Sequence, residues 1–291
     1  MNDCFCYKNR KYIAIYCKIL YYDIAEVVCM QIVTININKG GTGKSTFSYN
    51  FSKWLSSRKN KKVLLIDGDS SCNLTYSFKE LGTSSIYDVF KGGGFEIYPV
   101  DKNMDFIKGS EFLTDEDLEL RKKQNNCLIL FMWFADNIEM LSKYDYVIID
   151  THNDASLVTS NFIAVADAVI GVSEPSRNGY RAWLELKETI NRLKSEVVDI
   201  MTRKSYIQAV PYLIGNKIEH IGRSSREFLD IIANDPGLVG IIPKKELLAK
   251  SLLSDKSIFE LQDEMSSAEK KRHRKFYEHI EEVFEKIINT I

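Results

Sequence analysis

The stretch KGGTGKST at residues 39–46 constrains the fold more than any other part of this 291-residue chain. It follows an apolar run, QIVTINI, and leads into STFSYNFSKWLSS, in which apolar residues recur at helical spacing. A glycine-rich turn between a strand and a helix directs backbone N–H groups inward, and the helix dipole favours an anion there. The sequence therefore predicts a phosphate-binding loop after the first strand and an α/β fold around it.

The residue types of this loop suit a nucleotide with its metal. Lys44 can reach the β- and γ-phosphates, and the Ser45 hydroxyl can ligate Mg²⁺. Thr46 could hydrogen-bond the α-phosphate, while Asn38 stands where the general phosphate-loop pattern has its first glycine. The predicted cofactor-binding residues of the loop are Gly40, Gly41, Thr42, Gly43, Lys44, Ser45 and Thr46.

A second lysine, Lys39, begins the loop. Two ammonium groups on one phosphate would partly repel each other, so Lys39 is expected to point away from the phosphate that Lys44 serves. It becomes useful if a second subunit approaches and Lys39 neutralises the phosphates of the partner's nucleotide, as arginine fingers do in trans. The sequence therefore predicts a homodimer that encloses its nucleotides.

Buried strand patterns alternate with helical segments along the rest of the chain. Further strands are predicted at 61–67, 104–110, 144–150, 166–174, 205–217 and 238–243, and further helices at 84–92, 176–196, 221–234 and 264–291. This alternation predicts a doubly wound, mostly parallel sheet flanked by helices.

One domain over residues 30–291 is the simplest organisation, because no linker or repeat divides the chain. Residues 1–29 hold neither helical nor strand periodicity for long. We expect a poorly ordered extension, or sequence upstream of the native start at Met30. The alternative is a small helix or strand docked on the sheet.

Three aspartates follow or end predicted strands, namely Asp67, Asp69 and Asp150. Ligands bind at the carboxyl ends of strands in open α/β sheets, so these carboxylates should gather near the loop. Mg²⁺ takes few protein ligands and keeps several waters. Ser45, Asp67 and Asp150 are therefore the predicted metal-site residues.

KGGTGKST resembles the deviant Walker A box of the ParA/MinD family of P-loop ATPases, a SIMIBI-type fold. VLLIDGDSSCNLT at 63–75 resembles the second box of that family, and YDYVIIDT at 144–151 is similar to its Walker B strand. The resemblance is strongest to the short, Soj-like ParA partition ATPases. Family members usually have a proline pair after the Walker B Asp-Thr, where this chain has His152, Asn153 and Asp154. His152 could be read as a general base or as a polar loop residue.

The resemblance implies a slow, partner-stimulated ATPase with ATP and Mg²⁺ as cofactors. It implies that the protein dimerises on ATP, binds DNA non-specifically and is released by hydrolysis, with a ParB-like centromere-binding protein as partner. Lys39, Lys44 and Asp69 would be catalytic, with Asp69 orienting the attacking water. Asn216 in IGNK resembles the residue that reads the adenine edge, although a plain turn asparagine is the alternative. The expected location is the cytoplasm, in association with the nucleoid.

The formal net charge of −1 argues against a globally basic nucleic-acid binder, so DNA contact would need a local patch. KKRHRK is the candidate, and its basic residues are Lys270, Lys271, Arg272, Arg274 and Lys275. A MinD-like membrane-associated ATPase is the alternative function, because the final helix is amphipathic. Glutamates on its polar face would repel anionic lipid, so we expect core packing and no stable membrane association.

Overall fold

The computed structural model describes residues 30–79 and 81–291, so the predicted extension at 1–29 lies outside the described residues. In this part of the chain eight strands form a sheet in the order β3-β4-β2-β5-β1-β6-β7-β8. The bounds are β1 Gln31–Ile35, β2 Val63–Gly68, β3 Tyr98–Asp101, β4 Met104–Ile107, β5 Tyr146–Thr151, β6 Ala168–Ser173, β7 Val210–Ile218 and β8 Leu238–Pro243. Every neighbouring pair is parallel except β3 and β4. The predicted mostly parallel α/β sheet is confirmed.

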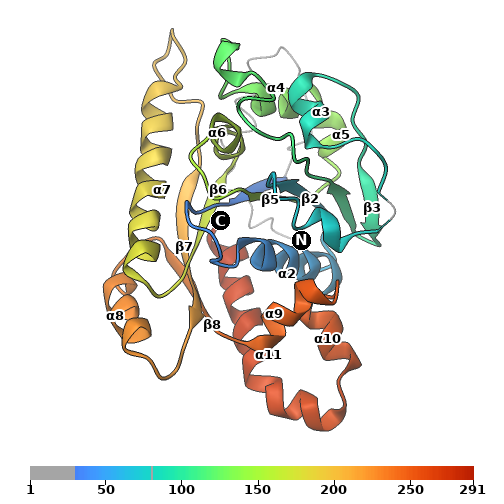
Figure 1. The fold of residues 1–291 in the computed structure, drawn as a ribbon, viewed down its shortest axis with the longest axis vertical. Coiled ribbons are helices and arrows are strands. Elements are labelled where there is room, and N and C mark those ends of the chain that lie inside the picture. The colour runs from blue at the N-terminus through green and yellow to red at the C-terminus, as the bar shows by residue number, and fades with distance from the viewer. Residues whose placement is uncertain (1–29, 80) are drawn as a thin grey trace, which may run out of the picture.

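Helices cover both faces of this sheet (Figure 1). One face carries α2 Lys44–Ser57, α9 Glu246–Leu253, α10 Ile258–Glu264 and α11 Ser267–Thr290. The other carries α3 Ile86–Lys91, α4 Ile129–Asp136, α5 Ile138–Leu141, α6 Leu157–Ala164, α7 Arg177–Glu196 and α8 Arg223–Ile232. Two short 3₁₀ turns, η1 Thr75–Ser77 and η2 Leu120–Lys122, complete the described elements.

Strand residues alternate between the two helical layers. In β2, Val63 and Leu65 pack in the same cluster as α2, whereas Leu64 and Ile66 pack with α3 and α4. Because successive side chains of a strand point to opposite faces, a strand covered on both faces is apolar throughout. This explains why the buried strands appear in the sequence as continuous apolar runs.

The final helix packs its apolar face into the core, as the sequence analysis expected. Phe276, Ile280, Val283, Phe284 and Ile287 of α11 are buried, and α11 contacts β8. The Phe284 ring lies 5.7 Å from that of Phe47 on α2, centroid to centroid. None of the helices in residues 30–79 and 81–291 combines the length and apolar composition that a bilayer crossing needs.

Some elements were not predicted. β3 is a four-residue edge strand with an alternately exposed pattern and a proline, Pro99, so it lacks the apolar run that marks the other strands. The sequence pattern also did not predict α4, α5, α6, α9 and α10. These helices have four to eight residues each, too few for a hydrophobic periodicity to stand out.

Candidate functional site

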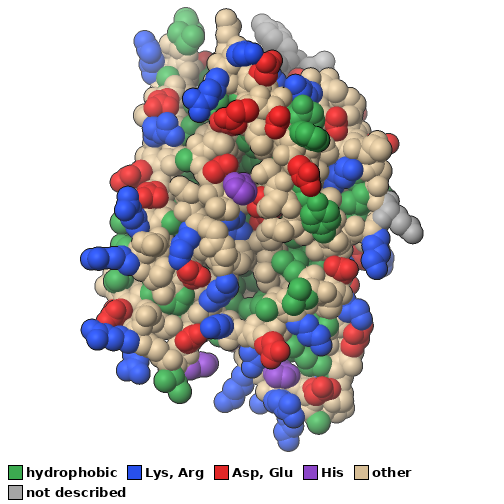
Figure 2. All heavy atoms as spheres, viewed as in Figure 1, with side chains coloured by type: hydrophobic (Ala, Val, Ile, Leu, Met, Phe, Trp, Pro, Cys, Tyr) green, Lys and Arg blue, Asp and Glu red, His purple; other side chains and the backbone are tan. Residues whose placement is uncertain are grey.

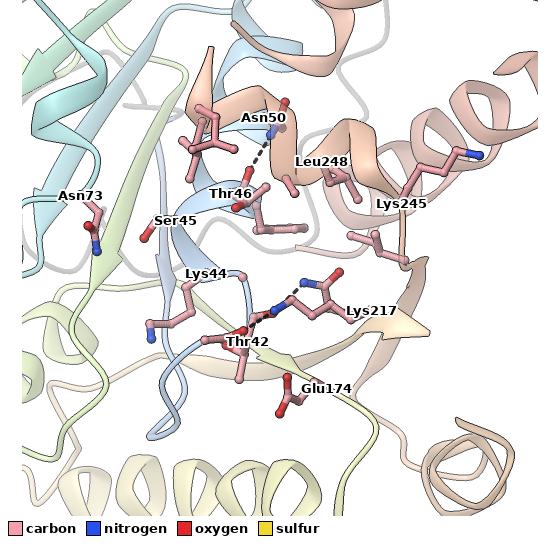
Figure 3. Close-up of a pocket in the computed structure, with 18 of the residues that line it drawn as sticks. Thr42, Lys44, Ser45, Thr46, Asn50, Asn73, Glu174, Lys217, Lys245 and Leu248 are labelled. Carbon is pink, nitrogen blue, oxygen red and sulfur yellow. Dashed lines mark hydrogen bonds between the residues drawn. The ribbon is translucent and has the colours of Figure 1, made fainter. Parts of the chain in front are cut away.

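A cleft of about 960 Å³ opens at the carboxyl ends of the central strands. The phosphate loop at residues 41–46 forms its floor, Asp69 and Asn73 line one side, and Asn216 and Lys217 the other. Figure 3 shows Asn73 across the loop from Lys217 and Lys245. An apolar wall from β8, α9 and α11 closes the remaining side, so the cleft can hold a charged group and a flat apolar group together.

The loop backbone takes the shape that its glycines allow. Gly41 and Gly43 have φ values of 73° and 96°, in the left-handed region that side chains disfavour. Gly43 also directly precedes α2 and forms its N-cap. The first N–H groups of that helix, which have no partner within the helix, are therefore at the cleft. The predicted binding residues Gly41, Thr42, Gly43, Ser45 and Thr46 all line the cleft, whereas Gly40 packs beside Asn153.

Lys44 is the buried cation of this loop and is 7% exposed. Burial lowers the pKa of its ammonium group, and the nearby carboxylates of Asp150, Asp69 and Asp154 oppose that shift. An ammonium held in this way next to backbone N–H donors is suited to a polyanion such as a nucleotide phosphate chain.

Two buried aspartates lie beside the phosphate loop, and they differ in whether both of their carboxylate oxygens accept hydrogen bonds. Asp67 and Asp150 are paired across β2 and β5. Asp67 Oδ2 accepts from the backbone N–H and the hydroxyl of Thr75, at 2.8 and 2.7 Å, and Oδ1 accepts from Asp69 N–H. Asp150 Oδ1 accepts from Ser48, and Oδ2 is buried with no hydrogen-bond partner among the described residues, although the Ser45 hydroxyl lies near enough to lower the pKa of this carboxyl. Burial raises the pKa of Asp67 to about 6 and that of Asp150 to about 7.

This donor set fits a hard divalent cation such as Mg²⁺, which binds oxygen atoms. The unpartnered Asp150 Oδ2 is the atom that points to it, because an orphaned buried carboxylate oxygen needs a proton or a cation. The oxygens of Asp67 are already engaged, so its geometry suits holding the β2–η1 turn more than direct coordination.

Asp69 lies at the wall of the cleft and contacts a residue that the sequence analysis left undecided. His152 Nδ1 is 2.7 Å from Asp69 Oδ1, which also accepts from Ser71 N–H at 2.8 Å. Burial acts to raise the pKa of Asp69, but the hydrogen bonds from Ser71 and the contact with His152 outweigh it, so the pKa is lowered.

Lys39 is not among the residues that line the cleft, although its ion-pair partner Glu174 is. Its ammonium group forms an ion pair with Glu174 and donates to Ser176 Oγ at 2.9 Å. Ser176 is also the N-cap of α7, where it accepts from Gly179 N–H. The expectation that Lys39 points away from the phosphate of its own loop agrees with this position, while the partner Glu174 was not anticipated.

Asn216 meets the phosphate loop from β7. Its Nδ2 donates to Thr42 O at 2.7 Å, and it lies inside the strand rather than after it. Lys217, which the sequence analysis did not single out, has a φ of 57° and donates to Gly41 O. The sequence pattern that could have pointed to Lys217 is GNK, in which this lysine directly follows Asn216, the residue predicted to contact the adenine.

The five basic residues of KKRHRK lie in the first half of α11 and are exposed. Arg274 pairs with Glu278 at 3.7 Å and Lys270 donates to Asp263 O. Lys and Arg side chains gather at the lower edge of the molecule in Figure 2, below α9 and α10. This surface is separate from the cleft floor.

Comparisons with known proteins agree with this geometry. The AAA domain family model matches residues 30–203. An uncharacterized ATP-binding protein of Methanocaldococcus jannaschii is 22% identical over 86% of this chain and 96% of its own length. The chromosome-partitioning ATPase Soj of Treponema pallidum is 27% identical over 56% of this chain and 64% of its own length, so the chain spans less than two thirds of Soj.

Among solved structures, a plasmid partition protein of Borrelia burgdorferi bound to AMPPNP has the same fold. Its TM-score is 0.72 at 22% identity, and the match covers 90% of this chain and 99% of the other. The family match over more than half of the chain agrees with the loop geometry and the strand order described above. The chain therefore belongs to the AAA domain family, and it is similar in sequence and fold to ParA-like ATPases.

Proposed function

We propose that this protein is an ATP-dependent DNA partition ATPase that dimerises on ATP, binds DNA non-specifically and is released by hydrolysis. The observation that carries the proposal is that the two lysines of the phosphate loop lie in different places. Lys44 is buried in the cleft, whereas Lys39 does not line the cleft and is held by Glu174 and Ser176 at its edge. A second lysine in that position is of use to a phosphate only across an interface.

In the hydrolytic site, ATP would lie on the loop with its phosphates on backbone N–H groups and Lys44. Mg²⁺, when bound, would neutralise phosphate charge, with Ser45 and Asp150 as its protein partners and Asp67 as support. Asp69 would accept a hydrogen bond from the attacking water, because its carboxylate lies on the cleft wall. Asn216, beside the loop, would contact the adenine edge.

Dimer formation would require Lys39 to exchange one anionic partner for another. In the monomer Glu174 and Ser176 hold its ammonium group. In the dimer that group would leave Glu174 and cross to the phosphates of the partner's ATP. Lys39 would have an anionic partner in both states, Glu174 in the monomer and the phosphates of the partner's nucleotide in the dimer. The dimer would therefore be favoured only by a nucleotide whose phosphates attract Lys39 more strongly than Glu174 does.

DNA would be bound by the basic run of α11, twice in each dimer, without base reading. A ParB-like centromere-binding protein would stimulate hydrolysis and release the DNA, in the nucleoid region of the cytoplasm. The apolar face of α11 is buried in the core, which does not favour the alternative of a MinD-like membrane-associated ATPase.

The test uses light scattering on the Asp69→Ala protein, in which hydrolysis should be blocked. With ATP and Mg²⁺ we expect its mass to double, and with ADP to stay that of a monomer. Lys39→Ala in the same background should remain monomeric with ATP, although it still binds the nucleotide. Lys122→Ala, an exposed lysine that pairs with Glu119 on the other helical layer, is the matched control.

Two results would count against the proposal. If Asp69→Ala stays monomeric at high concentration with ATP, the ATP-dependent dimer is wrong. If Lys39→Ala dimerises as well as its parent, the role of Lys39 across an interface is wrong.

A further inference from the structure

His152 and Asp69 are brought together by the register of two neighbouring strands. β2 and β5 pair Asp67 with Asp150 and Gly68 with Thr151, so Asp69 and His152 come next on the same edge. A residue that directly follows a third strand, β1, also holds the backbone of His152. Asn36 Nδ2 donates to Thr151 Oγ1 at 2.6 Å and to the carbonyl oxygen of His152 at 3.4 Å. Both residues of the contact therefore directly follow strands that are paired in the sheet.

The hydrogen bonds of Asp69 are unequally divided between its oxygens. Oδ1 accepts from the N–H and hydroxyl of Ser71 and contacts His152 Nδ1 at 2.7 Å. Oδ2 has no hydrogen-bond partner among residues 30–79 and 81–291, although the Asp69 side chain is only 7% exposed. An ionised carboxylate only accepts, so the imidazole Nδ1 carries the hydrogen in this contact.

We propose that His152 is a positioning residue for hydrolysis, which fixes Asp69 Oδ1 so that Oδ2 is the oxygen offered to the attacking water. This inference rests on the proposed ATPase function and names a further residue of the same site. A carboxylate that is free to rotate about its Cβ–Cγ bond would present either oxygen. Three donors on Oδ1 remove that freedom before the nucleotide arrives, and such preorganisation lowers the barrier without adding binding energy.

The test is a single-turnover measurement of ATP hydrolysis, with nucleotide affinity measured separately. We expect His152→Ala to lower the rate constant roughly 10- to 100-fold, since misplacement of a positioned group costs that much, with the nucleotide Kd unchanged within about twofold. His152→Asn should recover most of the rate, because its Nδ2 can donate from the place of the imidazole Nδ1.

A double-mutant comparison separates positioning from general damage. In the Asp69→Glu background, which keeps a carboxylate but moves it away from its place beside the imidazole, His152→Ala should cause little further loss of the remaining rate, because its effect acts through the position of Asp69. Two results would overturn the proposal. One is a full additive loss of rate in the double variant, and the other is a higher nucleotide Kd for His152→Ala with an unchanged rate constant. A His152→Asn protein that is as slow as His152→Ala would overturn it as well. A wild-type protein that fails to hydrolyse ATP would instead contradict the proposed function itself.

Discussion

Gly43 shows how closely single residues of the phosphate loop are constrained. Its φ of 96° lies in the left-handed region, and a Cβ at this position would lie 2.5 Å from Asn216 Nδ2. That amide holds the carbonyl oxygen of Thr42. A side chain at residue 43 would therefore strain the backbone and push away the residue that joins β7 to the loop.

Gly43→Ala should weaken nucleotide binding by roughly tenfold or more, because the loop must pay about 1–2 kcal/mol of strain and lose the Asn216 contact. Calorimetric titration with a non-hydrolysable ATP analogue measures the effect. Gly41→Ala has a similar φ of 73° but no atom within 4 Å of its Cβ, so it isolates the strain from the clash. Gly94→Ala, also with open space, is the control for folding. Equal binding by Gly43→Ala and wild type would show that the loop can rearrange.

α11 shows how one element carries two different surfaces. Its second half buries Ile280, Phe284 and Ile287 in the core, and its first half carries the exposed basic run. A capping box at Ser266 and Glu269 starts the helix, which fixes where the basic side chains begin. The buried half anchors the helix, so changes in the exposed half should leave the fold intact.

Lys271→Ala with Lys275→Ala should reduce the affinity for DNA and lower the slope of log affinity against log salt concentration by about 2, if each lysine neutralises one phosphate. Fluorescence anisotropy with ATP at several salt concentrations measures this slope. Arg121→Ala with Lys122→Ala, an exposed basic pair at η2, should leave it unchanged. An unaltered slope in the α11 variant would place the DNA contact elsewhere.

At the scale of the whole molecule, Asp167 ties three strands together at the edge opposite the cleft. Its Oδ2 accepts from Ile32 N–H of β1 at 2.8 Å, and its carbonyl oxygen accepts from Val210 N–H of β7 at 2.9 Å. Burial raises the pKa of Asp167 to about 6, against the hydrogen bond from Ile32, which lowers it. The native protein thus holds a proton at pH values where the unfolded chain has lost it.

The contribution of Asp167 to stability is therefore largest below pH 4 and is lost as the pH rises through about 6. We expect the free energy of unfolding of the wild type, relative to Asp167→Asn, to fall by about 1–3 kcal/mol between pH 4 and pH 7. Urea unfolding of both proteins across this range measures the difference, and a common effect of pH on other groups cancels. A difference that stays constant with pH would contradict the assignment.

The sequence by itself determined the buried strands, though not the edge strand β3, together with the phosphate loop and the identity of its charged residues. Doubly covered strands are continuous apolar runs, and the glycine and lysine spacing of KGGTGKST demands one backbone shape. The acids at strand ends could be placed near the loop, because parallel strands deliver their carboxyl ends to one edge. These are local patterns, so a single sequence is enough to predict them.

Only the tertiary structure decided which of these residues meet. Lys39 and Glu174 are 135 residues apart, Asn216 and Thr42 are 174 apart, and His152 and Asp69 are 83 apart. Such contacts depend on strand order and register across the sheet, and hydrophobic periodicity carries no information about either. The sequence therefore supplied the chemical groups of the site, and the folded sheet set their pairing.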